Sequence, residues 1–153
     1  MEKIAVITKQ LETKHWHDNC AICGKRNLLS LELDFISTEN QSISAQFKSH
    51  SGLQGYDGYL HGGVISSLLD AAMTHCLFHY GVVAVTGDLR IRFLHLIPCD
   101  AYVVVNAQIK AIKYGIYIVT AELLVNDHVM AKAEAKFVKY GGSVMGHQTE
   151  CHL

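Results

Sequence analysis

The fold of this chain is decided by the stretch Gly58-Tyr-Leu-His-Gly-Gly-Val-Ile-Ser-Ser-Leu-Leu-Asp-Ala-Ala-Met-Thr-His-Cys-Leu-Phe-His-Tyr-Gly81. Between residues 64 and 80 it holds neither proline nor glycine, and Asp70 is its one charged side chain. Apolar residues recur at steps of three and four, which is the period of a helix. Ala71 and Phe78 make the opposite side partly apolar as well. We therefore predict a helix that is buried nearly all round. Its periodic apolar residues are Val64, Ile65, Leu68, Leu69, Ala72, Met73, Cys76 and Leu77.

Two features of this helix are chemically unusual. It begins with His61-Gly62-Gly63. Because glycine has no side chain, we expect the first backbone N–H groups of the helix to be unobstructed, and such groups bind anions or developing oxyanions. Two turns later comes Asp70, a carboxylate in apolar surroundings, where an ionised group is costly unless it is paired or solvated. Spacing alone leaves the alternative open, since Gly-Gly is often only a turn and a mid-helix Asp often bonds to its neighbours.

Composition bounds the class of protein. The chain has 153 residues, 50% of them hydrophobic, a net charge of −1 and a mean hydropathy of +0.17. It is too apolar for a disordered protein, and its charge predicts no nucleic-acid partner. Polar residues interrupt the long helix, so we expect a soluble domain rather than a membrane span. No export signal is evident near the N-terminus, and the five cysteines are irregularly spaced, so we expect a cytoplasmic protein with reduced thiols.

The first 26 residues precede the main domain. The spacing of apolar residues within 2–16 predicts a short amphipathic helix. A Cys-x-x-Cys pair follows, Cys20 and Cys23, and with His17 it offers three zinc ligands. No second cysteine pair stands at the spacing of a closed tetrahedral site. We therefore favour a compact turn with two free thiols, and we expect neither a metal nor another cofactor.

The remaining elements are strands. Residues 29–36 alternate apolar and polar side chains, and residues 42–48 repeat the pattern after a polar turn, which predicts a hairpin. Four long strands follow the helix, at 82–97, 101–113, 116–126 and 128–140, and their short connections favour antiparallel pairing. The chain is thus predicted to be α+β, with a curved antiparallel sheet wrapped around one long helix. This domain spans residues 27–140, and residues 141–153 form a loose tail.

Three segments resemble a known family. The pattern Gly58-x-x-His61-Gly-Gly-x-x-x-x-Leu68-x-Asp70 resembles the hot-dog-fold acyl-CoA thioesterases of the phenylacetate-pathway type. The run from Val85 to Pro98 is similar to their next strand, and the leader Cys20-x-x-Cys-Gly-x-x-Asn27 to that of one subgroup. The resemblance implies a hot-dog fold, an acyl-CoA or related acyl thioester as substrate, and a homodimer or a dimer of dimers.

It also implies roles for particular residues. Asp70 is expected to be the general base or nucleophile, and the sequence does not decide between the two. The amide of Gly62, with Gly63 beside it in the bare helix start, is expected to polarise the thioester carbonyl. A hydroxyl at Thr86 would help to place the attacking water, and Gln54 is the nearest match to an assisting amide side chain, one residue from the commonest spacing.

Further residues complete this set of expectations. For His61 we favour a structural role before the helix over direct proton transfer. Many relatives place a basic residue after the glycine of a later turn, where this chain has Ile116. The candidates for contacts with coenzyme A phosphates are therefore Arg92, Lys110 and Lys113.

Helix geometry adds an inference of its own. Gly62 and Asp70 are eight residues apart, which separates their Cα atoms by roughly 12 Å along a helix axis. One carbonyl therefore cannot easily touch both groups of the same helix. If both act on one thioester, two antiparallel helices from two subunits must bring unlike ends together, which makes two equivalent sites.

Two other functions compete with the thioesterase. Hot-dog domains also serve as acyl-ligand binding modules, but a mere binder needs no carboxylate beside a thioester, so Asp70 favours the enzyme. Hot-dog dehydratases usually show a His before a Pro-Gly helix entry or a hydratase-type Asp/His loop, and neither is present.

Overall fold

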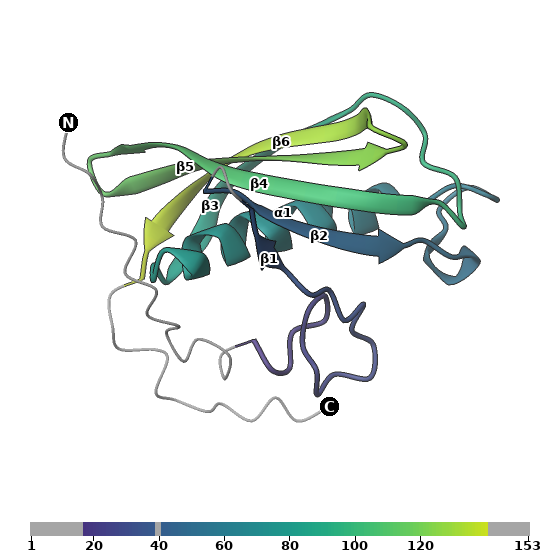
Figure 1. Ribbon diagram of the computed structural model, residues 1–153, viewed down its shortest axis with the longest axis horizontal. Helices are drawn as coiled ribbons and strands as arrows, with labels where there is room; N and C mark the ends of the chain where they lie inside the picture. Colours follow the sequence, from purple (N-terminus) through teal and green to yellow (C-terminus); the bar gives the residue numbers. More distant parts are fainter. Residues whose placement is uncertain (1–16, 39–40, 141–153) are drawn as a thin grey trace.

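The computed structural model describes residues 17–38 and 41–140, so the predicted helix at 2–16 and the tail at 141–153 lie outside the described residues. A long helix, α1 (Gly62–His79), packs against one face of a six-stranded antiparallel sheet (Figure 1). It contacts five of the strands, β2 to β6. In the described part of the chain, no helix has the length and apolar character needed to cross a membrane.

The sheet has the strand order β1-β2-β4-β5-β6-β3. Its strands are β1 (Ile36–Ser37), β2 (Ile43–Lys48), β3 (Ala84–Phe93), β4 (Tyr102–Lys113), β5 (Ile116–Val125) and β6 (His128–Lys139). A 3-10 turn, η2 (Ser51–Leu53), precedes α1. The first strand after the helix, β3, pairs with the last strand, β6, and so forms one edge of the sheet.

Most of the predicted elements are confirmed. The helix was expected from about residue 64 and begins at Gly62, and the strands at 101–113, 116–126 and 128–140 differ by at most one residue at each end. The first strand after the helix is shorter than its predicted range of 82–97. The hairpin turns at residues 114–115 and 126–127 have positive φ at both central positions, as in the tight turns that match the twist of antiparallel strands.

The prediction of a strand at residues 29–36 is wrong. Only Ile36 and Ser37 pair with β2, so the first hairpin is two residues deep. Glu32 adopts a φ of 50°, which breaks the extended backbone in the middle of the predicted strand. Leu33 is nevertheless buried, and Leu31 and Phe35 pack against the core. The alternating pattern therefore reports burial of one side of an irregular segment.

The core lies between α1 and the inner face of the sheet. Leu68, Leu69 and Met73 of the helix are fully buried. The alanine row of β6 (Ala131, Ala133 and Ala135) is buried too, and α1 contacts this strand. Small side chains let a helix approach a strand closely, so this packing fixes the height of α1 over the sheet. It thereby sets where Asp70 lies.

Candidate active site

Asp70 and Thr86 are brought together across the gap between α1 and β3. The Thr86 hydroxyl donates a hydrogen bond to Asp70 Oδ1 at 2.7 Å. Thr86 is exposed and Asp70 half-buried, so solvent reaches the pair. The ladder between β3 and β6 shifts register between Thr86 and Asp88, and bulges of this kind re-aim side chains next to active sites. A carboxylate held by one hydroxyl donor and open to solvent can accept a proton from water.

The start of α1 offers one free amide rather than two. His61 is the N-cap residue, and its Nδ1 accepts the Gly63 N–H at 2.7 Å. The expectation that the N–H groups of both glycines are free is therefore wrong for Gly63. Gly62 is exposed, and its N–H makes no hydrogen bond to the residues that the structure describes. Gly62 is thus the donor of the helix start that a ligand can use.

Gln54 lies in the loop that leads to the helix. Its Oε1 accepts the Gly58 N–H at 3.2 Å, and its backbone forms an isolated bridge with Leu60. Gly58 has a φ of +84°, a conformation that favours glycine at this bend. In this arrangement Gln54 holds the loop that places His61 and Gly62.

A cavity of about 650 Å³ opens beside Gly62. The loop at 55–56, residues 59–62, Ile65 of α1 and residues 93–97 line it. Phe93 and Leu96 are 54% and 66% exposed, so its wall is apolar and open. Sequence reasoning missed Phe93, His95 and Leu96 as site residues, although they stand together just before the chain's one proline. Neither Asp70 nor Thr86 lines this cavity.

The basic candidates lie elsewhere. Lys110 makes an ion pair with Glu134 at 2.6 Å, and this partner lowers the pKa of the Glu134 carboxyl. Arg92 of β3 and Lys113 at the end of β4 are exposed. None of the three basic residues is among those that line the cavity beside Gly62. Their predicted contact with coenzyme A stays a prediction.

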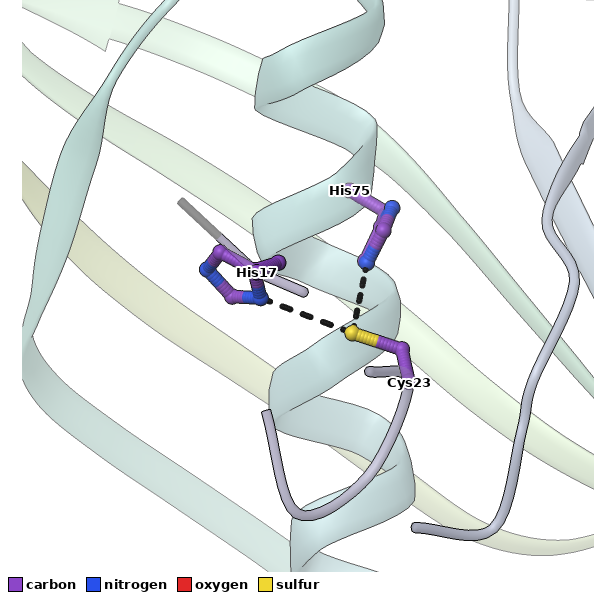
Figure 2. Close-up of side chains that lie close together, drawn as sticks. All are labelled: His17, Cys23 and His75. Atoms are coloured by element: carbon purple, nitrogen blue, oxygen red, sulfur yellow. Dashed lines mark hydrogen bonds between the residues drawn. The ribbon is translucent and has the colours of Figure 1, made fainter. Parts of the chain in front are cut away.

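A second cluster of reactive side chains forms where the leader, residues 17–24, meets α1. Cys23 lies between His17 of the leader and His75 of the helix (Figure 2). The four cysteines in the described residues are free thiols. Sequence reasoning missed His75, because 52 residues separate it from Cys23 and no spacing rule covers that distance.

Comparison with known proteins agrees with this fold and with the sequence motif. Residues 57–127 match the family model of the Thioesterase superfamily. The acyl-coenzyme A thioesterase THEM4 of Rattus norvegicus is 31% identical over 107 residues, which are 69% of this chain and 46% of that protein. The chain thus spans about half the length of the curated relative. The match, this relative and the shared fold confirm the resemblance to the hot-dog thioesterase superfamily.

Solved structures show the same fold. The PaaI protein from the phenylacetic acid degradation operon of E. coli aligns with a TM-score of 0.68 and 20% identity, over 84% of this chain and 100% of that one. The protein smu.793 of Streptococcus mutans, solved with acetyl CoA bound, aligns with a TM-score of 0.66 and 20% identity, over 71% and 89%. At these identities the likeness shows the fold alone, a helix packed on a curved antiparallel sheet.

Proposed function

We propose that this chain is an acyl-CoA thioesterase, which hydrolyses an acyl thioester to a free acid and a thiol as a homodimer. The observation that carries the proposal is the hydrogen bond from Thr86 of β3 to Asp70 of α1, a helix whose exposed Gly62 lines an apolar cavity. The rat relative is named an acyl-coenzyme A thioesterase, and the Streptococcus mutans structure holds acetyl CoA. Both support coenzyme A as the thiol part of the substrate.

Two subunits share each site in this proposal. Gly62 and Asp70 are on one helix, roughly 12 Å apart along its axis, and the cavity reaches only Gly62. The edge strand β3 has a free side and carries exposed apolar residues, Val85 at 44% and Phe93 at 54%. Exposed edge strands are usually covered. Twofold pairing of two β3 strands covers both edges and brings Asp70 of one subunit toward Gly62 of the other.

The chemistry divides between the subunits. The Gly62 N–H of one subunit stabilises the negative charge that develops on the thioester oxygen. Asp70 of the other subunit takes a proton from water, which attacks the carbonyl carbon, and the thiol leaves with that proton. Alternatively, Asp70 attacks the carbonyl itself, the thiol leaves, and water then hydrolyses the mixed anhydride. Both routes consume one water and yield one acid and one thiol.

The acyl group is assigned to the cavity beside Gly62. Its volume of about 650 Å³ lies within the range of small-molecule pockets. Tyr59, Phe93 and Leu96 supply an apolar wall that suits an acyl chain or an aromatic acyl group. Residues of the second subunit would close its open side, so the depth of the pocket depends on both chains.

The test is a panel of short, long and aromatic acyl-CoA esters. We expect release of one thiol and one acid per ester for at least one acyl class, followed with a thiol reagent and by mass spectrometry of the acid. The protein is kept far below the substrate concentration, because a partly exposed thiol such as Cys99 would consume the same reagent. If the esters bind stoichiometrically and no thiol is released, the chain is a binding module and the proposal is wrong.

Thr86 offers a graded test. Thr86→Val keeps the size of the side chain and removes the donor to Asp70. A hydrogen bond to a charged group contributes about 1.5–3 kcal/mol, so we expect kcat to fall roughly 10- to 100-fold. Thr86→Ser retains the hydroxyl and should keep most of the activity. Equal rates for Thr86→Val and the wild type would contradict a role for this hydroxyl.

A further inference from the structure

The leader, residues 17–24, is held against the second half of α1 by the cluster of reactive side chains. Cys23 Sγ lies 3.4 Å from His17 Nδ1 and 3.1 Å from His75 Nε2. Figure 2 shows the thiol pointing between the two imidazole rings, with His17 and Cys23 on the leader and His75 on the helix. The thioesterase chemistry proposed above uses none of these three residues.

The two sulfur–nitrogen distances in this cluster match those of a tetrahedral metal site. All three ligand atoms lie within 4.8 Å of one another. In a tetrahedral zinc site, with Zn–S of about 2.3 Å and Zn–N of about 2.0 Å, a sulfur and a nitrogen are roughly 3.5 Å apart. The two observed separations, 3.4 and 3.1 Å, are close to this value. Three donors from two separate segments therefore already converge on one point.

Cys20 is our candidate for the fourth donor, and it stands outside the cluster of three ligand atoms. It belongs to the same Cys-x-x-Cys turn as Cys23 and is half-buried like it. The Ile22 N–H points at Cys20 Sγ at 3.4 Å, and N–H donors of this kind orient and stabilise ligating groups. A Cβ at position 24 would lie 2.4 Å from the Cys20 nitrogen, so the turn packs tightly around its glycine. The leader is thus preformed around its two thiols.

Aromatic rings pack against both imidazoles of the cluster. His75 stacks on Phe35 with ring centroids 4.3 Å apart, and His17 meets Phe78 edge-on at 4.8 Å. These contacts fix the orientation of the two rings, as the surroundings of ligating histidines do.

We propose that His17, Cys20, Cys23 and His75 form a structural zinc site that ties the leader to α1. Two thiolates with two imidazoles are a donor set typical of zinc, and four protein ligands leave no open position for catalysis. The closed tetrahedral site that the cysteine spacing alone does not complete is completed by a histidine of the central helix. Its role is to hold the leader beside the helix that carries Asp70.

The test is the metal content of the full chain, purified without a histidine tag, loaded with zinc and desalted. We expect about one zinc per chain by mass spectrometry of the metal, as four ligands from one chain predict. Cobalt should bind in its place with the visible spectrum of a tetrahedral thiolate complex. Absence of stoichiometric zinc, or a Cys20–Cys23 disulfide in freshly purified protein, would overturn the proposal.

Variants assign the ligands. Loss of an outer-shell partner already weakens metal binding about 10- to 100-fold, so Cys23→Ser and His75→Ala should each weaken zinc binding by more than about 100-fold. Cys20→Ser tests the fourth ligand and should also weaken binding and change the cobalt spectrum. Unchanged zinc affinity in Cys23→Ser or His75→Ala overturns the site, and in Cys20→Ser it overturns the four-ligand assignment.

Matched controls separate this cluster from other cysteines and histidines. Cys99→Ser and His79→Ala, the latter on the same helix but exposed, should keep one zinc. Replacement of His147, Cys151 and His152 in the tail should also leave the zinc bound; loss of zinc there would overturn the assignment. Chelation of the zinc should lower Tm by about 5 °C or more, since binding stabilises only the folded chain. These measurements do not depend on thioester hydrolysis, so either proposal can fail alone.

Discussion

Substitution of Asp70 by Asn lowers kcat for acyl-CoA hydrolysis by about 100- to 10,000-fold, the range that general acid–base catalysis contributes. Asparagine keeps the shape of the side chain, and its oxygen can still accept the hydrogen bond from Thr86. Its neutral amide neither takes a proton from water nor attacks a thioester. The measurement is the initial rate with the best ester of the acyl-CoA panel, at saturating and at low concentrations.

A matched control makes this loss specific. Asp127→Asn is the same chemical change at an exposed turn between β5 and β6, where the backbone φ of 62° suits asparagine. It should leave kcat unchanged. Circular dichroism and size-exclusion chromatography of both variants should match the wild type. An Asp70→Asn variant with undiminished kcat would remove Asp70 from the mechanism.

The second large effect is expected at the start of the helix. Gly62→Pro removes the one N–H that the proposed oxyanion needs, and proline is well tolerated at the first position of a helix. The preceding residue, His61, has φ −64° and ψ 135°, which suits a residue before proline. Loss of one oxyanion donor costs about 100- to 1,000-fold in kcat, and we expect a decrease of that size.

Gly62→Ala is the control because it retains the N–H. A Cβ at this position would lie 3.6 Å from Phe93 Cε1, an ordinary van der Waals contact. We therefore expect Gly62→Ala to fold and to keep most of the wild-type rate. If Gly62→Pro is as active as Gly62→Ala, this amide is not the oxyanion donor.

Mixing the two inactive variants tests whether two chains share one site. In a mixed dimer, the Gly62→Pro subunit supplies an intact Asp70 and the Asp70→Asn subunit an intact Gly62, so one of the two sites is complete. Random association makes half of the dimers mixed, and co-expression should restore about a quarter of the wild-type activity. A mixture as inactive as its components would show that each site is built from one chain.

Sequence patterns predicted the elements that local physics controls. The helix-period spacing of apolar residues at 64–80 predicted α1, and the strand predicted at 128–140 matches β6 to within one residue. The short connections between the last three strands predicted their antiparallel pairing. The prediction failed at residues 29–36, because alternation reports which side is buried and cannot report the left-handed backbone at Glu32.

At the site, too, the sequence predicted local features and missed contacts between distant residues. Residue type and spacing singled out Asp70 and Gly62, but they could not show that the Gly63 N–H is taken by His61. They also missed the apolar wall at Phe93 and Leu96, because exposed apolar residues are recognised as a pocket only when their neighbours are known.

By itself, the sequence determined the helix, the long strands and the chemical identity of the groups at the helix start and its middle, since periodicity and residue type are local properties. Only the tertiary structure decided that Thr86 donates to Asp70 and that His75 joins Cys23 across 52 residues. Contacts of this kind depend on how the helix is seated over the sheet and the leader against the helix. Core packing sets these positions, and no spacing along the chain encodes them.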